Sequence, residues 1–209
     1  MTPQMTPQDR FRALAPDARA FWLDPAEAAF VAQGYGATSV NRILDALGTS
    51  KGRFYHYFDG KTGLFSETLN RALSRVRLPG DGALSGAADA AGFWRGARAL
   101  ADALAAGLRR DSALAALLRD LYRDPEAMQA VTGLTQALRY RIEALILAGQ
   151  RLGAVRRDLP VSLLAGAAFD LLLSLDRWFA AQTLPPAEAE RLARTAFSLL
   201  ENLLKPEAP

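Results

Sequence analysis

Apolar residues recur at intervals of three and four along almost the whole chain, which is the spacing of one face of an α-helix. Alanine and leucine fill most of these positions, and β-branched residues are sparse. Capping residues, glycines and prolines divide the pattern into segments. We therefore predict an all-α protein with helices at residues 24–33, 38–46, 50–57, 61–77, 89–109, 112–121, 125–151, 160–182 and 186–204.

Before the first of these helices lies a helical segment, residues 9–22, that is broken at Ala15-Pro16. Asp24-Pro25 then has the composition of a helix start, with an N-cap followed by the first helical residue. A proline inside a helix costs about 3 kcal/mol or more, which argues against one continuous helix through residue 25. Residues 1–23 are therefore predicted to be an N-terminal extension.

A glycine-rich stretch at residues 78–89 is the strongest candidate for a boundary between two parts of the chain. It follows five helical segments and precedes five more. We accordingly predict a first domain at residues 24–77 and a second domain at residues 78–209.

The short segments 38–46 and 50–57 are separated by a tight turn at Gly48. Two helices joined in this way, together with the helix before them, form a helix-turn-helix. In such a unit the second helix lies in the major groove of DNA, with its N-terminal residues at the base edges. The pattern thus predicts that segment 50–57 is a DNA recognition helix.

The side chains of that segment sort into two faces. Phe54 and Phe58 are four residues apart, so they share one face, which we expect to be buried. Helical geometry points Lys51, Tyr55 and His56 away from that face. The core could not hold Lys51 in any case, because burying an unpaired ammonium is costly.

The charge distribution supports a polyanionic partner for the N-terminal part. The formal net charge is only +3, but residues 1–80 hold ten Lys and Arg against seven Asp and Glu, whereas the remainder is balanced. Residues 38–77 alone hold seven cations and three anions. A modest basic region of this kind is typical of phosphate binding.

Several classes of function are disfavoured by what the sequence lacks. There is no cysteine, which rules out disulfides and thiolate metal sites. The single histidine, His56, cannot supply the Glu-x-x-His ligand sets of carboxylate-bundle enzymes. Neither a phosphate-binding loop nor a nucleophile elbow is present. We expect no catalytic residue, no metal and no cofactor, and an all-α enzyme is the weakest of the alternatives.

The N-terminus has neither the basic nor the apolar region of a signal peptide, so we expect a cytoplasmic protein. The longest apolar stretch, residues 159–175, contains proline, serine and aspartate. A membrane span needs about 20 mostly apolar residues, so a buried helix is the better interpretation and no membrane partner is expected.

Residues 30–65, FVAQGYGATSVNRILDALGTSKGRFYHYFDGKTGLF, resemble the DNA-binding region of the TetR/AcrR family of transcriptional regulators. The resemblance lies in Gly34-Tyr35, Thr38-Ser39-Val40, Ser50-Lys51-Gly52, the aromatic run 54–58 and Lys61 before Leu64-Phe65. It implies a repressor that a small-molecule effector releases from a palindromic operator. A DNA-binding protein without an effector stays open as an alternative.

The resemblance also implies which residues contact double-stranded DNA: Thr38, Thr49, Ser50, Lys51, Gly52, Arg53, Tyr55, His56 and Lys61. The hydroxyl groups of Thr38, Ser50 and Tyr55, together with His56 and Lys61, are expected at phosphates, and Lys51 and the Gly52 amide at base edges. Thr49 is expected at either the DNA backbone or a thymine methyl group. Arg53 is expected to select sequence through guanine. The extension before Pro25 could pack on this domain or reach DNA through Arg10, Arg12 and Arg19.

By the same resemblance, residues 78–209 would bind an effector. Candidate pocket residues are Trp94, Arg98, Tyr122, Met128, Tyr140, Phe169 and Asp170. Asp170 stands in an otherwise apolar run, and a buried carboxylate needs a partner. That partner is either a cationic ligand or an internal arginine, namely Arg98, Arg139 or Arg177.

Segments 160–182 and 186–204 have broad apolar faces that predict a homodimer. Paired across a two-fold axis, they would form a four-helix bundle, unless both faces serve only the core of one chain. The predicted interface residues are Leu164, Ala168, Leu171, Leu175, Leu192, Ala196, Leu199 and Leu203. Two recognition helices would then bind half-sites about one turn of DNA apart.

Overall fold

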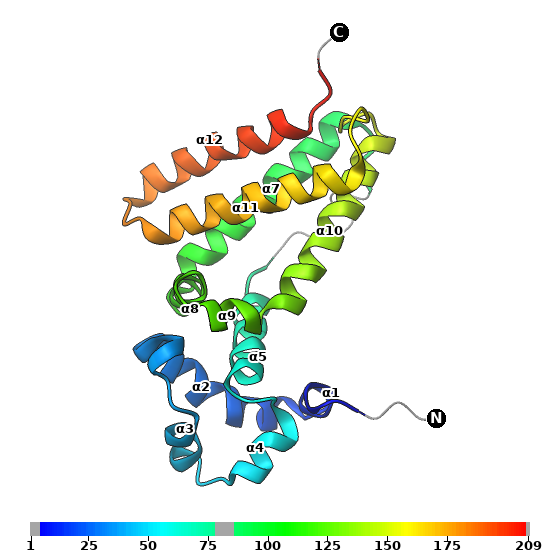
Figure 1. The fold of residues 1–209 in the computed structure, drawn as a ribbon. Helices are drawn as coiled ribbons and strands as arrows, with labels where there is room; N and C mark the ends of the chain where they lie inside the picture. Colours follow the sequence, from blue (N-terminus) through cyan, green and yellow to red (C-terminus); the bar gives the residue numbers. More distant parts are fainter. Residues whose placement is uncertain (1–4, 78–85, 208–209) are drawn as a thin grey trace. The chain divides into compact units, whose positions relative to one another are not determined.

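The computed structural model describes residues 5–77 and 86–207, and every regular element in these ranges is an α-helix (Figure 1). The helices are α1 (Pro7–Arg12), α2 (Pro16–Ala37), α3 (Val40–Ala46), α4 (Lys51–Tyr57), α5 (Lys61–Ser74), α7 (Ala90–Arg110), α8 (Ser112–Arg123), α9 (Pro125–Ala130), α10 (Thr132–Arg151), α11 (Val161–Ala181) and α12 (Pro186–Leu204). The predicted all-α class is confirmed. The predicted segment 125–151 is in fact two helices, α9 and α10.

The helices form two compact units that are not contiguous in sequence. The first unit comprises the residues up to 75 together with 112–132, and the second comprises 76–111 and the residues from 133 onward. Helices α8 and α9, which we predicted to belong to the second domain, therefore pack with the first unit. Most of the predicted boundary at 78–89 lies outside the described residues.

Helix α2 passes through Pro25, so the predicted helix start at Asp24 is wrong. The reason is tertiary packing on both sides of the proline. Trp22 and Leu23 before it and Phe30 after it are almost completely buried on the same unit. Burial stabilises each such side chain by about 1.5–3 kcal/mol, which together exceeds the local cost of the proline.

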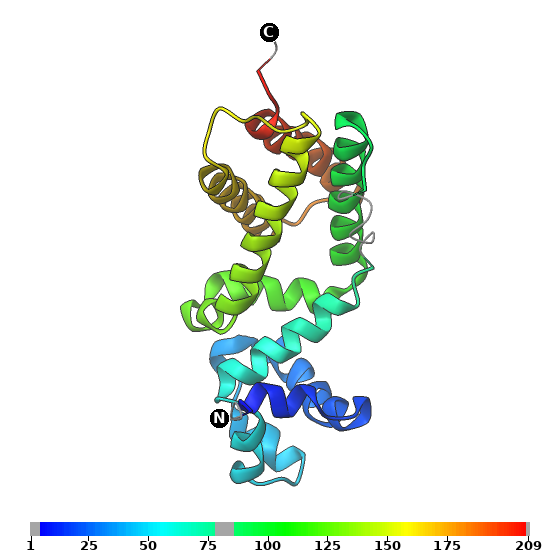
Figure 2. The ribbon, with the colours of Figure 1, turned by 90° about the vertical axis from the view of Figure 1, so that its right-hand side faces the viewer.

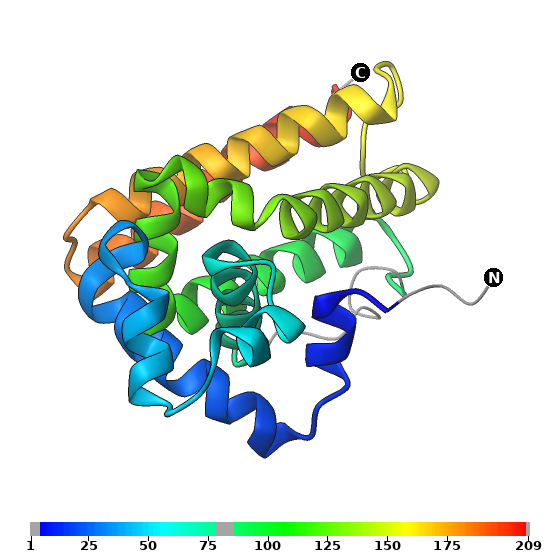
Figure 3. The same ribbon diagram turned by 60° about the horizontal axis from the view of Figure 1, so that its bottom comes forward.

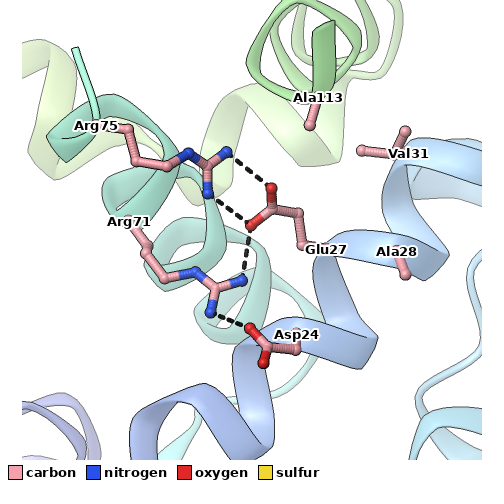
Figure 4. Close-up of a pocket in the computed structure, with 7 residues that line it drawn as sticks. All are labelled: Asp24, Glu27, Ala28, Val31, Arg71, Arg75 and Ala113. Carbon is pink, nitrogen blue, oxygen red and sulfur yellow. Dashed lines mark hydrogen bonds and ion pairs between the residues drawn. The ribbon is translucent and has the colours of Figure 1, made fainter. Parts of the chain in front are cut away.

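Ion pairs join α2 to α5 beside Pro25 (Figure 4). Arg71 donates from Nη1 to Asp24 at 2.5 Å and from Nη2 to Glu27 at 2.7 Å. Arg75 donates to both carboxylate oxygens of Glu27, at 2.7 and 3.0 Å. Burial alone would raise the pKa of Glu27, but the hydrogen bonds from Arg75 and Arg71 outweigh it and lower that pKa below 4.5. An open surface pocket of about 660 Å³ is lined by these four side chains with Ala28, Val31 and Ala113.

The core of the second unit is built from α7, α10, α11, α12 and the connection at residues 152–160. Phe93, Ile146 and Phe169 are buried in it. Gly149 permits this packing, since a Cβ atom there would lie 2.5 Å from Val155 Cγ2 and 2.9 Å from the Phe93 ring. Helices α11 and α12 run side by side in this unit (Figure 1). Although α11 is strongly apolar, no helix among the described residues is both long and apolar enough to cross a bilayer.

Two predicted interface residues are not available for a dimer contact. Leu164 and Ala168 are buried in the core of their own unit, so for them the intrachain alternative is correct. Their stripe of α11 is covered by other helices of the unit, and Leu203 of α12 is partly buried against the same core.

The remaining predicted interface residues stay solvent-accessible to different degrees. Leu171, Leu175, Leu192 and Ala196 are half-buried, and Leu199 is 52% exposed. Three further apolar side chains of α11, which we did not predict, are also exposed: Leu163, Leu172 and Trp178.

We expect Glu27→Gln to lower the free energy of unfolding by about 1–3 kcal/mol, because Arg71 and Arg75 lose a charged acceptor. The pKa of Glu27 is lower in the folded state, so its contribution is present above pH 4.5 and is lost as the pH falls through the folded-state pKa. Urea titrations of both proteins near neutral pH and near pH 3 should therefore show a difference that shrinks in acid. A difference of equal size at both values would contradict this assignment.

Candidate nucleic-acid interface

Aromatic packing fixes the inner face of α4. Phe54 and Phe58 are fully buried, which confirms their predicted orientation. Their rings lie 6.2 and 5.6 Å from the Trp22 ring, centroid to centroid, and Phe11 lies 4.7 Å from Phe58. Tilted and edge-on aromatic contacts of this kind are favourable beyond the area that they bury. The orientation of α4 on the unit is therefore set by α1 and α2.

The beginning of α4 is fixed by its cap. Ser50 is the N-cap, and its hydroxyl accepts a hydrogen bond from the Arg53 N–H at 3.2 Å. Gly48 in the preceding turn has a φ of 58°, a left-handed conformation that favours glycine. Cap and turn together determine that Lys51 and Gly52 occupy the first helical turn.

The outer face of α4 is polar and exposed (Figure 3, in which α3 and α4 come forward). Its exposed residues are Ser50, Lys51, Gly52, Arg53, Tyr55 and His56, and the Tyr55 side chain is 60% exposed. The face combines two cations with hydroxyl and imidazole groups, which are the groups that bind phosphates and base edges. The structure thus brings together six of the nine predicted DNA-contacting residues; Thr49, beside them, is half-buried.

Arg53 has a neighbour that the sequence did not reveal. Its guanidinium carbon lies 5.4 Å from the Phe21 ring and 5.8 Å from the Trp22 ring, within the range of cation–π interactions. We had assigned residue 21 to a separate extension, whereas it belongs to α2. Phe21 therefore restricts the orientations available to Arg53.

The predicted phosphate contact of Thr38 is wrong. The residue is only 4% exposed, and its hydroxyl donates to the carbonyl oxygens of Gly34 at 2.6 Å and Ala29 at 3.2 Å. The Thr38 N–H also donates to the Gly34 carbonyl, so backbone and side chain of Thr38 both close the end of α2. Thr38 stabilises the turn before α3 and does not face the solvent.

Lys61 also contacts the protein itself. Its ammonium donates to the carbonyl oxygens of Tyr35 at 2.8 Å and Gly36 at 3.3 Å, and it lies 4.3 Å from the centre of the Tyr35 ring. These contacts hold the start of α5 against the end of α2. The proposed phosphate contact of Lys61 stays a prediction, since DNA would have to compete with these two acceptors.

The same turn is held from the other side by α8 and α9. The backbone N–H of Tyr35 donates to the carboxylate of Asp120. Burial, together with the nearby carboxylates of Glu126 and Asp124, raises the pKa of Tyr35 to about 12. This attachment explains why residues 112–132 pack with the first unit.

The N-terminal extension packs on the rest of the first unit, where α1 (dark blue) lies beside the other helices of that unit in Figure 2. Two of its arginines make polar contacts there. Arg10 donates from Nε to the backbone oxygen of His56 at 2.8 Å. Arg12 forms an ion pair with Glu67 at 2.7 Å. Of the two alternatives for the extension, packing on the domain is correct for these two residues.

The predicted effector residues are divided between the two units. Tyr122 and Met128 lie on α8 and α9 in the first unit, whereas the other five lie in the second. Phe169 is buried in the core, and the half-buried Trp94 donates from its indole N–H to the Ala154 carbonyl. Tyr140, by contrast, is 64% exposed.

Asp170 is not the buried carboxylate that we predicted. Its side chain is 73% exposed, and Arg139 lies 3.8 Å away. An exposed pair at this distance contributes little to stability. Arg98, the other charged candidate, forms an ion pair with Glu201 at 3.0 Å and lies over the Phe197 ring.

Comparison with known families decides between the classes of function. Residues 23–68, which contain α3, α4 and most of α2 and α5, match the family described as bacterial regulatory proteins, tetR family. These residues therefore form a helix-turn-helix domain of the tetR family, and the helix-turn-helix prediction is confirmed. The chain is accordingly a DNA-binding transcriptional regulator. No curated protein matches the chain.

Solved structures of other proteins share the fold of this chain over nearly its full length. NalD of Pseudomonas aeruginosa has a TM-score of 0.68 at 22% identity, covering 93% of this chain and 100% of its own. GusR of Salmonella enterica has a TM-score of 0.64 at 24% identity, with 92% and 98% covered. The fatty acid degradation regulator FadR of Bacillus halodurans has a TM-score of 0.63 at 19% identity, with 90% and 95% covered.

We expect Lys51→Ala and Tyr55→Phe each to weaken binding to a cognate duplex by about 1–3 kcal/mol, because each removes one polar contact with DNA. Both side chains are exposed, so the melting temperature should stay nearly unchanged. Fluorescence anisotropy and differential scanning fluorimetry measure the two quantities. Arg151→Ala, which removes an exposed cation from the second unit, is the control and should leave affinity intact. A large fall in melting temperature would instead assign Lys51 or Tyr55 to the core.

Proposed function

We propose that this TetR-family protein is a homodimeric repressor whose two α4 helices bind the half-sites of a palindromic operator. The observation that carries the proposal is the polar outer face of α4 on a helix anchored by Phe54 and Phe58. Lys51 and Arg53 would approach base edges, and Ser50 would bind phosphate. Side chains held on a rigid helix lose little conformational entropy on binding, which favours selective recognition.

Exposed apolar side chains support the homodimer. Leu163, Leu172 and Trp178 of α11 and Leu199 of α12 are all exposed. Exposed apolar residues on two neighbouring helices are candidates for an interaction site, and a two-fold interface uses the same surface of both copies. A two-fold dimer would present two α4 helices about 34 Å apart, one turn of DNA, to a palindrome.

We propose the repressor role and the effector by analogy with proteins of similar fold. NalD is described as the secondary repressor of a multidrug efflux pump, and FadR as a regulator of fatty acid degradation. By analogy we propose that a small molecule binds the second unit near Trp94 and Phe169. It would act by preferring a conformation in which both α4 helices cannot reach their half-sites together.

A regulator without an effector is the second candidate. It is favoured by the packing of the second unit, in which Phe169 is buried in the core and Trp94 is packed against it. A screen of small molecules for release of the bound duplex separates the two candidates. Release by one compound class supports the effector, and failure of every class supports the second candidate.

The DNA-binding function is tested by selecting duplexes from a random-sequence pool with the full-length protein. We expect enrichment of one palindrome whose half-site centres are about 10 base pairs apart, or a multiple of that spacing. Binding should fall steeply with salt, because each neutralised phosphate releases counterions. A pool that stays random after selection would refute this function.

We expect Leu199→Arg to convert the dimer to a monomer and to weaken operator binding. The side chain is already 52% exposed, so the charge should not disturb the fold of one chain. Sedimentation velocity measures the mass, and circular dichroism checks the helix content. Leu104→Arg is the matched control, since Leu104 is also exposed in the second unit but lies on α7. A Leu199→Arg dimer of unchanged stability would exclude this surface as the interface.

A further inference from the structure

Helix α1 is too short to be stable without support. It has six residues, whereas isolated helices shorter than about 12 residues are marginal in water. A capping box at Thr6 and Asp9 satisfies its first N–H groups: the Asp9 N–H donates to the Thr6 hydroxyl, and the Thr6 N–H donates to the Asp9 carboxylate, both at 3.1 Å. The rest of its stability has to come from contacts with other helices.

Three consecutive residues of α1 make those contacts: two with the C-terminal end of α4 and one with α5. Arg10 donates from Nε to the His56 carbonyl at 2.8 Å. Phe11 is buried and packs on Phe58. Arg12 forms two hydrogen bonds, at 2.7 and 3.0 Å, with Glu67, a nearly buried carboxylate of α5. Helix α1 therefore spans the junction between α4 and α5 (Figures 2 and 3).

The Arg10 contact falls at the end of α4, where carbonyl groups lack helical partners. A helix leaves its last four carbonyls unpaired and carries partial negative charge there, so a guanidinium is a favourable partner. The same guanidinium donates from Nη1 to the Met5 carbonyl at 2.7 Å. Arg10 thus ties the end of α4 to the segment that precedes α1.

Fixing one end of α4 affects the whole recognition face. The helix has only seven residues, and Ser50 caps its other end. Lys51 and Tyr55 lie within two turns of His56, so a tilt at the C-terminal end displaces both relative to a bound duplex. Displacements of this size are enough to weaken hydrogen bonds, whose strength falls steeply with distance and angle.

We propose that Arg10 is a positioning residue for DNA recognition: through its hydrogen bond to the His56 carbonyl, it fixes the orientation of α4. This inference rests on the proposed function, in which α4 binds DNA. The competing interpretation is that Arg10 leaves His56 in the complex and binds a phosphate directly.

The test compares Arg10→Ala with the unchanged protein on the duplex that the unchanged protein selects from a random pool. We expect about a tenfold loss of affinity, the size expected for losing a charge-assisted hydrogen bond. The slope of log affinity against log salt should stay the same, because a positioning residue releases no counterion. A slope reduced by about one unit would identify a phosphate contact and overturn the proposal, as would unchanged affinity.

Arg123→Ala is the matched control, because it removes one exposed positive charge from the first unit and leaves the Arg10–His56 contact in place. It should leave both the affinity and the salt slope unchanged. Arg10→Lys should restore part of the affinity, since an ammonium can still donate to one of the two carbonyl oxygens. A lysine variant that keeps the full affinity and slope, beside an alanine variant with a lower slope, would again point to phosphate, because an ammonium still neutralises it.

Hydrogen exchange in the DNA-free protein provides a readout that does not depend on operator binding. We expect faster exchange of the amides of Tyr57 and Phe58 in Arg10→Ala, because the last turn of α4 opens more often. Unchanged exchange would refute the positioning contact even where affinity falls. The unchanged protein could select no duplex although amide exchange is faster in Arg10→Ala. In that case the proposed function fails, and the hydrogen bond from Arg10 to the His56 carbonyl has only a structural role.

Discussion

The burial of Trp22 against Phe54 and Phe58 is the interaction on which the first unit depends. Trp22 precedes Pro25, so its burial stabilises the part of α2 that a proline would otherwise separate from the rest. The same rings cover the inner face of α4 and leave its other face to solvent. One aromatic cluster thereby both maintains a helix against its local sequence and directs the recognition helix outward.

The turn between α2 and α3 connects this cluster to a segment from later in the sequence. Lys61 binds the Tyr35 carbonyl, and Asp120 binds the Tyr35 N–H, so the peptide groups on either side of Tyr35 are held by α5 and α8. Residues 112–132 are joined at both ends to helices of the second unit, α7 and α10. Covalent continuity thus links α7, which carries Trp94 of the proposed effector site, to helices that contact the DNA-binding region.

Local rules predicted most helices and the division of α4 into two faces, because periodicity and capping are encoded within a few residues. The four-residue spacing of Phe54 and Phe58 was sufficient for that division. The same rules failed at Pro25, where distant aromatic packing outweighs the local cost, and at Thr38, where carbonyl acceptors of α2 attract the hydroxyl. Asp170 was wrongly predicted to be buried. An apolar run does not reveal which face of the helix is covered by its neighbours.

The central claim, that the outer face of α4 binds DNA, is tested most directly by amide chemical-shift mapping. The ¹⁵N-labelled protein would be titrated with the palindromic duplex that it selects, at moderate salt. The account predicts that the largest shifts fall on residues 49–56, with smaller shifts at the start of α3 and little change in α11 and α12. Large shifts elsewhere, with residues 49–56 unaffected, would contradict it.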